Sequence, residues 1–274
     1  MKSRRLDRAV LAGLIMLAGG ASAVSAQTAP SLGSAQSYAV LGGSTVTNTG
    51  PSVIGGDLGL SPGSSVTGFP PGVVSGGTIH AADAAALSAQ NSLVTAYNSA
   101  AGQSCTQDLT GQDLGGKILT PGVYCFSTSG ALTGTLTLNA QGNSAAVFIF
   151  KFGSTLTTAT ASSVVMTNGG TQCNVFWQVG TSATLGTATA FAGNILALSS
   201  ITVTTGVSVV GRALARNGAV TLDTNNVTPA TCASAAPVPV PPVPVPTLTE
   251  WALIMLAVLL AAAGFVALNR RTPA

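Results

Sequence analysis

Side chains that could act as catalysts or metal ligands are few and scattered in this 274-residue chain. A glycoside-cleaving site needs paired carboxylates, and general acid–base catalysis needs titratable groups within reach of the reacting atoms. Between residues 27 and 246 the acidic residues are Asp57, Asp83, Asp108, Asp113 and Asp223. The single histidine, His80, has no second ligand at the spacing of a metal site. The sequence therefore predicts no enzyme, and it implies no bound ion or cofactor.

Charged residues make up only 6% of the chain, and most of its cations lie near the two ends. From residue 27 to residue 246, four cations and five acids give a net charge of 4 − 5 = −1. A nucleic-acid-binding surface needs Lys and Arg clustered on one face. The formal net charge of +3 for the whole chain therefore does not indicate a nucleic-acid partner.

Threonine is the polar residue with a regular spacing. Pairs at positions i and i+2 flank one apolar residue, and partial copies keep one threonine of the pair. The candidate surface residues are Thr45, Thr47, Thr135, Thr137, Thr155, Thr157, Thr184, Thr202, Thr204 and Thr221. On stacked strands, such side chains would lie about 6.7 Å apart along a strand and about 4.8 Å apart between strands. This spacing predicts a flat array of hydroxyl and methyl groups, although Thr is also a common strand former on any solvated face.

The elements that would hold this array are short strands between residues 147 and 223. Apolar residues alternate there with small or hydroxyl residues, which is the period of a strand buried on one face. The step from Leu185 to Val203 nearly equals the step from Val203 to Leu222, whereas the step from Leu156 to Leu185 is longer, as if one coil carried an insertion. A unit of about 20 residues cannot bury its own apolar side. We therefore expect successive coils to stack into a parallel β-helix.

An earlier segment, residues 46–55, resembles residues 203–211, and Val66 follows Val46 by a step of similar size. The β-helix is therefore expected to be discontinuous, with a helix over residues 78–101 between its two parts. Apolar residues recur there every three or four positions, with Thr78 as a candidate N-cap, Asp83 near the positive end of the helix dipole and Gly102 at the end. Such a helix would be about 35 Å long and could cover several coils.

Residues 1–26 have the pattern of an export signal, with a basic start, a short apolar run and small residues before Gln27. Export to an oxidising compartment favours disulfides, and no pair of the four cysteines has C-x-x-C spacing. Three pairings are possible, with free thiols as the remaining alternative. We favour Cys105 with Cys125 and Cys173 with Cys232, in a domain that covers residues 27–234.

The composition changes after this domain. Residues 235–246 form a Pro-rich linker, for which an extended polyproline spacer is expected. The segment 251–268 is apolar and carries no charge, and arginines follow at positions 270 and 271. This pattern predicts a transmembrane helix at residues 251–268, and thus a membrane partner for residues 247–274.

Residues 37–232 resemble the bacterial and fungal ice-binding-like domain family. The likeness is carried by VIGGDLGLSPG (53–63), LTPGVY (119–124), FIF (148–150), STLTTA (154–159), NVFWQVG (174–180), ATLGT (183–187), GRALA (211–215) and GAVTLD (218–223). The resemblance implies a mainly β fold, a discontinuous right-handed parallel β-helix with one long α-helix alongside. It also implies an ice crystal surface as partner, with the threonine array ordering water into a layer that joins the crystal.

The tail is similar to C-terminal sorting signals that begin with an Ile- or Val-Pro-Thr-Leu motif. The matching residues are Pro246, Thr247, Leu248, Glu250 and Trp251. This resemblance implies processing by an exosortase-type membrane enzyme, and release from or attachment to the cell envelope or surface; a plain membrane anchor is the alternative.

The sequence thus favours an exported antifreeze-type protein that adsorbs to ice through a flat Thr-rich face. The alternative is a cell-surface adhesin, or a matrix or structural protein, in which the same domain meets carbohydrate or cell-surface partners. Phe148, Phe150 and Phe152 share one side of a strand and are expected in the core. Trp177 faces away from Phe176 and is the aromatic residue whose exposure would favour sugar stacking.

Overall fold

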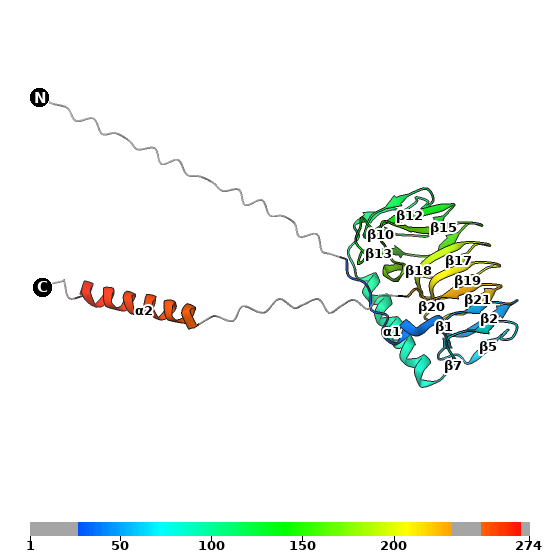
Figure 1. Cartoon of the computed structure of the whole chain (residues 1–274), viewed down its shortest axis with the longest axis horizontal. Helices are drawn as coiled ribbons and strands as arrows, with labels where there is room; N and C mark the ends of the chain where they lie inside the picture. Colours follow the sequence, from blue (N-terminus) through cyan, green and yellow to red (C-terminus); the bar gives the residue numbers. More distant parts are fainter. Residues whose placement is uncertain (1–26, 232–247, 270–274) are drawn as a thin grey trace, which may run out of the picture. The chain divides into compact units, whose positions relative to one another are not determined.

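The computed structural model describes residues 27–231 and 248–269. The chain divides into two compact units, Met1–Cys232 and Ala233–Ala274. In the first unit, parallel strands form a 15-stranded and a 7-stranded sheet (Figure 1). These sheets comprise three stacks of strands, as expected for a β-helix, and we name them the threonine stack, the helix-side stack and the third stack.

The 7-stranded sheet is the threonine stack. Its members, in spatial order, are β11 (Gly130–Leu132), β14 (Leu156–Thr158), β17 (Ala183–Leu185), β19 (Ile201–Val203), β21 (Val220–Asp223), β2 (Thr45–Thr49) and β5 (Ser65–Thr67).

The 15-stranded sheet supplies the other two stacks. The helix-side stack contains β8 (Gln107–Asp108), β10 (Gly122–Phe126), β13 (Phe148–Phe152), β16 (Val175–Val179), the C-terminal halves of β18 (Ala190–Ala197) and β20 (Ser208–Ala215), β1 (Tyr38–Gly42), β4 (Asp57–Leu60) and β7 (Ile79–Ala81). The third stack contains β9 (Ile118–Leu119), β12 (Thr135–Asn139), β15 (Ser163–Thr167), the N-terminal halves of β18 and β20, β22 (Asn226–Thr228), β3 (Val53–Ile54) and β6 (Val73–Val74).

Strands β18 and β20 each belong to two stacks because they continue around a corner. Gly193 pairs with Gly211 at this corner, and both have positive φ, +109° and +152°. A Cβ atom at Gly211 would lie 1.9 Å from the carbonyl oxygen of Gly193. The corner therefore requires glycine for both its backbone conformation and its close strand approach.

The solenoid is discontinuous in sequence, as predicted. The coil β20–β21–β22 pairs with β1–β2–β3, so the N-terminal coils stack on the C-terminal ones. Helix α1 (Ala84–Ala101) then leads from β7, which pairs with β4, to β8, which pairs with β10. Figure 1 shows α1 running along the side of the strands. The first solenoid strand along the chain, β1, and the last, β22, therefore both lie in the middle of the stack.

Helix α1 begins later than the sequence suggested. The predicted start at residue 78 is wrong, because Ile79–Ala81 form β7 on the edge of β4 and Ala82 has a positive φ of 56°. Asp83 is the N-cap, and its carboxylate accepts a hydrogen bond from the N–H of Ala86 at 2.8 Å. At 18 residues, the helix is about 27 Å long rather than about 35 Å.

Two apolar clusters stabilise this unit. The inward side chains of all three stacks fill the solenoid, while Leu93, Ala96 and Tyr97 of α1 pack on the outer side of the helix-side stack. Trp177 lies inside the solenoid, fully buried, stacked on Phe150 with ring centroids 4.1 Å apart, and its Nε1–H donates to the carbonyl of Ala192 at 2.9 Å. It therefore offers no sugar-stacking surface, whereas Phe148, Phe150 and Phe152 are buried as expected.

The predicted Cys105–Cys125 disulfide is present and joins the chain after α1 to strand β10. Cys173 is also disulfide-bonded, and its predicted partner, Cys232, lies outside the described residues. Residues 1–26, the linker 235–246, and Pro246 and Thr247 of the sorting motif also lie outside them.

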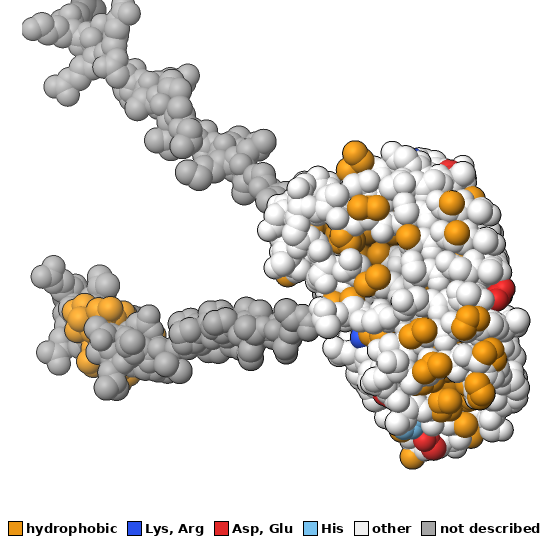
Figure 2. Space-filling view, turned by 45° about the vertical axis from the view of Figure 1, so that its right-hand side comes forward, with side chains coloured by type: hydrophobic (Ala, Val, Ile, Leu, Met, Phe, Trp, Pro, Cys, Tyr) orange, Lys and Arg blue, Asp and Glu red, His pale blue; other side chains and the backbone are white. Residues whose placement is uncertain are grey.

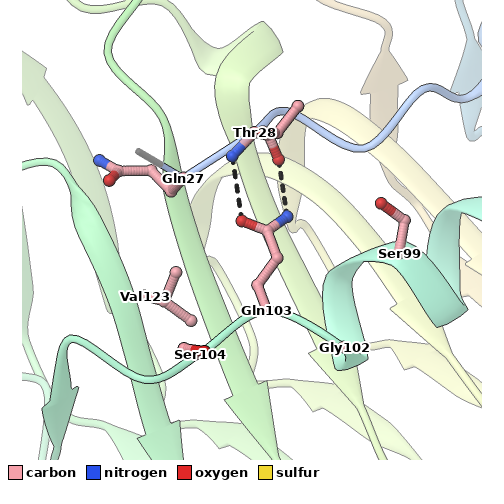
Figure 3. Close-up of a pocket in the computed structure, with 7 residues that line it drawn as sticks. All are labelled: Gln27, Thr28, Ser99, Gly102, Gln103, Ser104 and Val123. Atoms are coloured by element: carbon pink, nitrogen blue, oxygen red, sulfur yellow. Dashed lines mark hydrogen bonds between the residues drawn. The ribbon is translucent and has the colours of Figure 1, made fainter. Parts of the chain in front are cut away.

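The N-terminal segment is held to the domain by polar contacts. Thr28 and Gln103 exchange two hydrogen bonds, Thr28 N–H to Oε1 at 3.0 Å and Nε2–H to the Thr28 carbonyl at 2.7 Å (Figure 3). Farther along, the buried Arg212 donates from Nε and Nη2 to the carbonyl of Gln36, and from Nη1 to Oδ1 of Asn194. Burial lowers the pKa of Arg212 to about 10, so these carbonyl dipoles support a charge that lies away from water.

In the second unit, the structure describes helix α2 (Leu248–Asn269), which includes Leu248, Glu250 and Trp251 of the predicted sorting motif. The predicted transmembrane segment, residues 251–268, lies in this helix. Within the described residues, no helix combines the length and the apolar character that crossing a membrane requires. The predicted span is therefore not confirmed.

Candidate functional site

One column of threonines runs across the outer surface of the threonine stack. The strand register pairs Thr157 with Thr184, Thr184 with Thr202, and Thr202 with Thr221. It continues from Thr221 to Thr47 and from Thr47 to Thr67. At about 4.8 Å per strand, these six side chains extend over roughly 24 Å. We call them the threonine column.

The column alternates with buried residues that fix its orientation. Leu156, Ala183, Ile201, Val220 and Val46 pair in register beside it and are fully or almost fully buried. Thr157, Thr221 and Thr67 are exposed, and the other three members are half-buried between their neighbours. Because each threonine stands on a strand whose alternate side chains lie in a packed core, the array is held rigidly.

Three more of the predicted residues lie on either side of the column. Thr45 pairs with Ser65, and Thr155 donates to Ser129 Oγ at 2.8 Å, both on the side that precedes the column residues along each strand. Thr204 lies on the other side, where its hydroxyl donates to the carbonyl of Leu185 at 2.7 Å. The predicted pairs therefore share one column, but they extend from it in opposite directions on different strands.

Thr135 and Thr137 do not belong to this surface. They lie on β12 in the third stack, where Thr135 pairs with Ser163 and Thr137 pairs with Val165 and Ile118. Their assignment to the same face as the other threonines is therefore wrong. Ile118 and Val165 are exposed, with 69% and 42% of their surface accessible, so the third stack presents aliphatic groups beside Thr137 instead of a threonine row.

Two threonines at this surface were not predicted. Thr67 ends the column, and Thr49 lies beyond Thr47 on β2, opposite Asp223. The coil-length step from Val46 to Val66 was the signal for Thr67, because it places the residue after Val66 opposite Thr47. Ser65 instead of a second threonine precedes Val66, so the pattern of threonine pairs does not predict Thr67.

Charge is scarce on the threonine stack. Of the residues in its seven described strands, only Asp223 is charged, and the hydroxyl of Thr205 donates to its carboxylate. On the face of the domain visible in Figure 2, few side chains are charged, and most are uncharged. The outward side chains of this surface are therefore mostly short neutral groups that carry hydroxyls and methyls, with Asp223 as the one strongly hydrated ion of the seven described strands.

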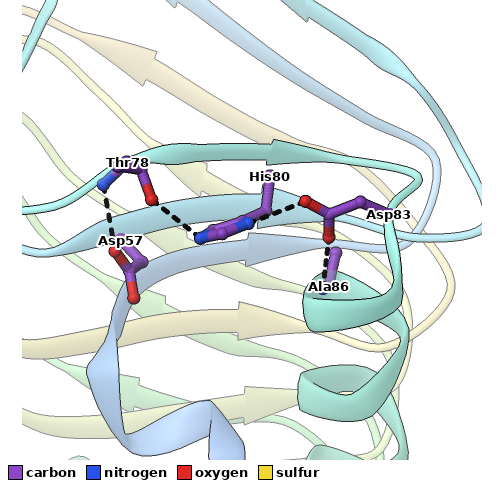
Figure 4. A network of polar contacts seen from close by, with 5 residues as sticks. All are labelled: Asp57, Thr78, His80, Asp83 and Ala86. Carbon is purple, nitrogen blue, oxygen red and sulfur yellow. Dashed lines mark hydrogen bonds and ion pairs between the residues drawn. The ribbon is translucent and has the colours of Figure 1, made fainter.

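His80, the other candidate for chemistry, belongs to the cap of α1. Its Nδ1 contacts Oδ2 of Asp83 at 2.8 Å, and its Nε2 contacts the hydroxyl of Thr78 at 2.8 Å (Figure 4). The other carboxylate oxygen of Asp83 caps the helix, and these hydrogen bonds, that of Ala86 first, hold the pKa of Asp83 below its ordinary value. No three His, Cys, Asp or Glu side chains in the described part of the chain form a metal-binding group.

Comparison with known proteins gives matches over the same region. The ice-binding-like family model matches residues 40–228, and the IPTL-CTERM motif, a sorting motif, matches residues 243–271. The chain is 58% identical over 200 residues to an ice-binding protein of Nostoc sp. (strain HG1), covering 73% of this chain and 74% of that protein. It is 32% identical to an ice-binding protein of Flavobacterium frigoris (strain PS1), covering 72% and 75%.

Solved structures agree. The crystal structure of an ice-binding protein from an Antarctic biological consortium has a TM-score of 0.73 at 46% identity, covering 75% of this chain and 93% of the other. The DUF3494 domain of Shewanella frigidimarina ice-binding protein 1 has a TM-score of 0.70 at 31% identity, covering 76% and 100%. That solved chain is matched in full, so it corresponds to the β-helix domain without a tail. With these matches and this discontinuous solenoid, the chain belongs to the ice-binding-like family.

Proposed function

We propose that this protein is exported and binds ice through the threonine column. The observation that carries the proposal is the register of Thr157, Thr184, Thr202, Thr221, Thr47 and Thr67 on six adjacent strands. The relatives named as ice-binding proteins support ice as the ligand, and the family match agrees with a function in binding rather than catalysis.

The mechanism depends on regular spacing. A net hydrogen bond to water contributes only about 1 kcal/mol, so one hydroxyl cannot hold a protein at a crystal surface. A column with a repeat of about 4.8 Å presents the same hydroxyl and methyl pair at each step, so ordered water on one threonine is in register with water on the next. Because the core already fixes these side chains, little side-chain entropy is lost when the ordered water joins the ice.

The test is a comparison of Thr202→Tyr with Thr135→Tyr in the domain of residues 27–234. Thr202 lies within the column, whereas Thr135 lies on the third stack, so the two variants add the same bulk to different faces. We expect ice uptake and faceted crystal growth for the wild type and Thr135→Tyr, and a several-fold weaker effect for Thr202→Tyr with an unchanged circular dichroism spectrum. Equal loss in both variants would refute the column as the site. Complete exclusion of the folded wild type from ice would refute ice binding.

The sorting tail adds a location to this function. We propose that an exosortase-type enzyme processes the IPTL-CTERM segment, residues 243–271, and that the domain is then released or held at the cell surface. A surface-held domain would serve as an adhesin that attaches the cell to ice. Fractionation of cells that produce the wild type and Pro246→Ala is the test. An unchanged mass and an unchanged fraction for the variant would contradict processing at this motif.

A further inference from the structure

An open surface cavity of about 490 Å³ lies on the helix-side stack, away from the threonine column. Its walls include Tyr97 of α1, the Cys105–Cys125 disulfide, Asp108, Lys151 and Gln178. No residue of the threonine column lines it. The volume is in the range of sites that bind small molecules.

The polar groups of this cavity lie on one rung of the sheet. Asp108 pairs with Cys125, Cys125 with Lys151, and Lys151 with Gln178. Side chains at paired positions of parallel strands point to the same face, about 4.8 Å apart. A carboxylate, a disulfide, an ammonium group and an amide therefore follow one another across roughly 14 Å of the cavity wall.

Gln178 has a side-chain amide without a protein partner. Only 6% of its surface is exposed, and within the described residues its amide has no hydrogen bond. Its amide atoms are not among the fully enclosed unpartnered atoms of this part of the chain, so they reach the solvent of the cavity. Buried amides are normally satisfied, and the buried Gln90 of α1 follows this rule, because it donates to the carbonyls of Gly42 and Ala215. The half-buried Gln103 is also satisfied, by Thr28 (Figure 3). The amide of Gln178 instead remains available to a ligand in the cavity.

Lys151 and Asp108 complete a set of donors and acceptors. The ammonium group of Lys151 donates to the carbonyl of Gln103 at 2.7 Å, which leaves two N–H groups, and it forms no ion pair within the part of the chain that the structure describes. Oδ1 of Asp108 accepts from the N–H and the hydroxyl of Thr110, which leaves Oδ2. Burial lowers the pKa of Lys151, consistent with a cation that lacks a carboxylate partner.

The combination indicates a neutral, polyhydroxylated ligand. The carboxylate of Asp108 would repel an anion, and the ammonium group of Lys151 would repel a cation. Sugar hydroxyls are neutral and both donate and accept hydrogen bonds. Tyr97 and the Cys105–Cys125 disulfide supply the apolar part of the wall. Only 8% of Tyr97 is exposed, and the guanidinium of Arg216 lies over its ring, with Cζ 4.7 Å from the ring centroid. We propose that this cavity binds one or two units of a neutral saccharide, with the amide of Gln178 as the central contact.

The test is titration of the domain of residues 27–234 with maltose, cellobiose and trehalose, observed at the side-chain NH₂ signals of Gln178 by NMR. We expect saturable shifts with at least one disaccharide and a dissociation constant on the order of 1 mM. Gln178→Leu keeps the side-chain size and should weaken binding at least tenfold. Gln112→Leu, at an exposed position outside the cavity, is the matched control and should not change binding.

Lys151→Met provides a second variant if Gln178→Leu does not fold, and it should also weaken binding. Absence of saturable shifts with all three sugars, or equal affinity of the wild type and the folded cavity variants, would overturn the proposal. Retention of the wild type on cellulose would identify a polymeric glycan as source, whereas binding of free disaccharides alone would identify a small solute. Ice uptake by Gln178→Leu should equal that of the wild type, so this test and the test of ice binding fail independently.

Discussion

Removal of the Cys105–Cys125 disulfide should destabilise the outermost coil next to α1. The bond closes a loop with a sequence separation of 20, which contains β8 and β9. In the chain-entropy model, ΔS ≈ −2.1 − 1.5R ln 20, or about −11 cal/mol/K, which corresponds to about 3.3 kcal/mol at 25 °C. For a domain of about 200 residues, where 1 kcal/mol shifts Tm by about 2–4 °C, Tm should fall by about 7–13 °C.

The assay is thermal unfolding of Cys105→Ala/Cys125→Ala in the domain of residues 27–234, with Ser99→Ala on the surface of α1 as the control. Each coil of a solenoid contacts only its neighbours, so amide hydrogen exchange should increase first at Leu109 and Leu114 and only later at Leu185. A Tm within about 2 °C of the wild type would refute the estimate, because that shift corresponds to less than about 1 kcal/mol. Uniform loss of protection in all coils would refute the local origin of the effect.

Two further predictions concern the corner between stacks and the cap of α1. Gly211→Ala should lower the free energy of unfolding by about 3 kcal/mol or more, because its Cβ would clash with the backbone of Gly193. Gly206→Ala, at φ +72° with open space around it, should lower it by only about 1 kcal/mol. Equal Tm values for the two variants in calorimetry would contradict this difference. The pKa of Asp83 is lowered by the hydrogen bonds from Ala86 and His80, so the folded state binds its proton more weakly than the unfolded state, and the stability that Asp83 contributes is present above about pH 4 and lost as pH falls through the lowered pKa. Lowering the pH from 5 to 3 should therefore reduce the Tm of the wild type more than the Tm of Asp83→Asn, which keeps a capping oxygen. Parallel curves of Tm against pH for the two proteins would contradict this assignment.

The sequence was sufficient to predict a discontinuous β-helix because its inward residues obey coil-length spacing. Leu185, Val203 and Leu222 pair in register, as the nearly equal steps between them indicated. Leu156 and Leu185 do not pair across the sheet, because Leu156 pairs with Ala183. The extra residues of this coil lie in the connections outside the paired strands of the threonine stack. Spacing predicts stacking only where the connecting loops keep a constant length.

The location of the threonines was harder to predict, because Thr-Leu-Thr has the same period of two on every stack. Thr135 and Thr155 have equivalent sequence neighbours, yet Thr135 lies on the third stack and Thr155 beside the threonine column. Only the pairing of whole coils distinguishes them. The start of α1 was misjudged for a related reason, since Ile79 and Ala82 fit a helical stripe but β7 gains strand pairing with β4. The unpartnered Gln178 has no sequence signal, because its neighbours across the sheet and on α1 are distant in the chain.

The discontinuous connectivity also has a mechanical consequence. β22 lies in the third stack, and Pro229, which follows it, lies beside Gly56 near the start of the helix-side stack, so the chain leaves at the edge opposite the threonine column. If the threonine column were attached to a surface and the C-terminal end of this domain were pulled, the force would thus act across the solenoid, from the face with the column to the opposite edge. It would load β22, which is flanked by β20 and β3 in the middle of the stack, instead of peeling an end coil from its single neighbour. A solenoid with chain ends at its extremities would unravel one coil at a time under the same load, and this topology avoids that weakness.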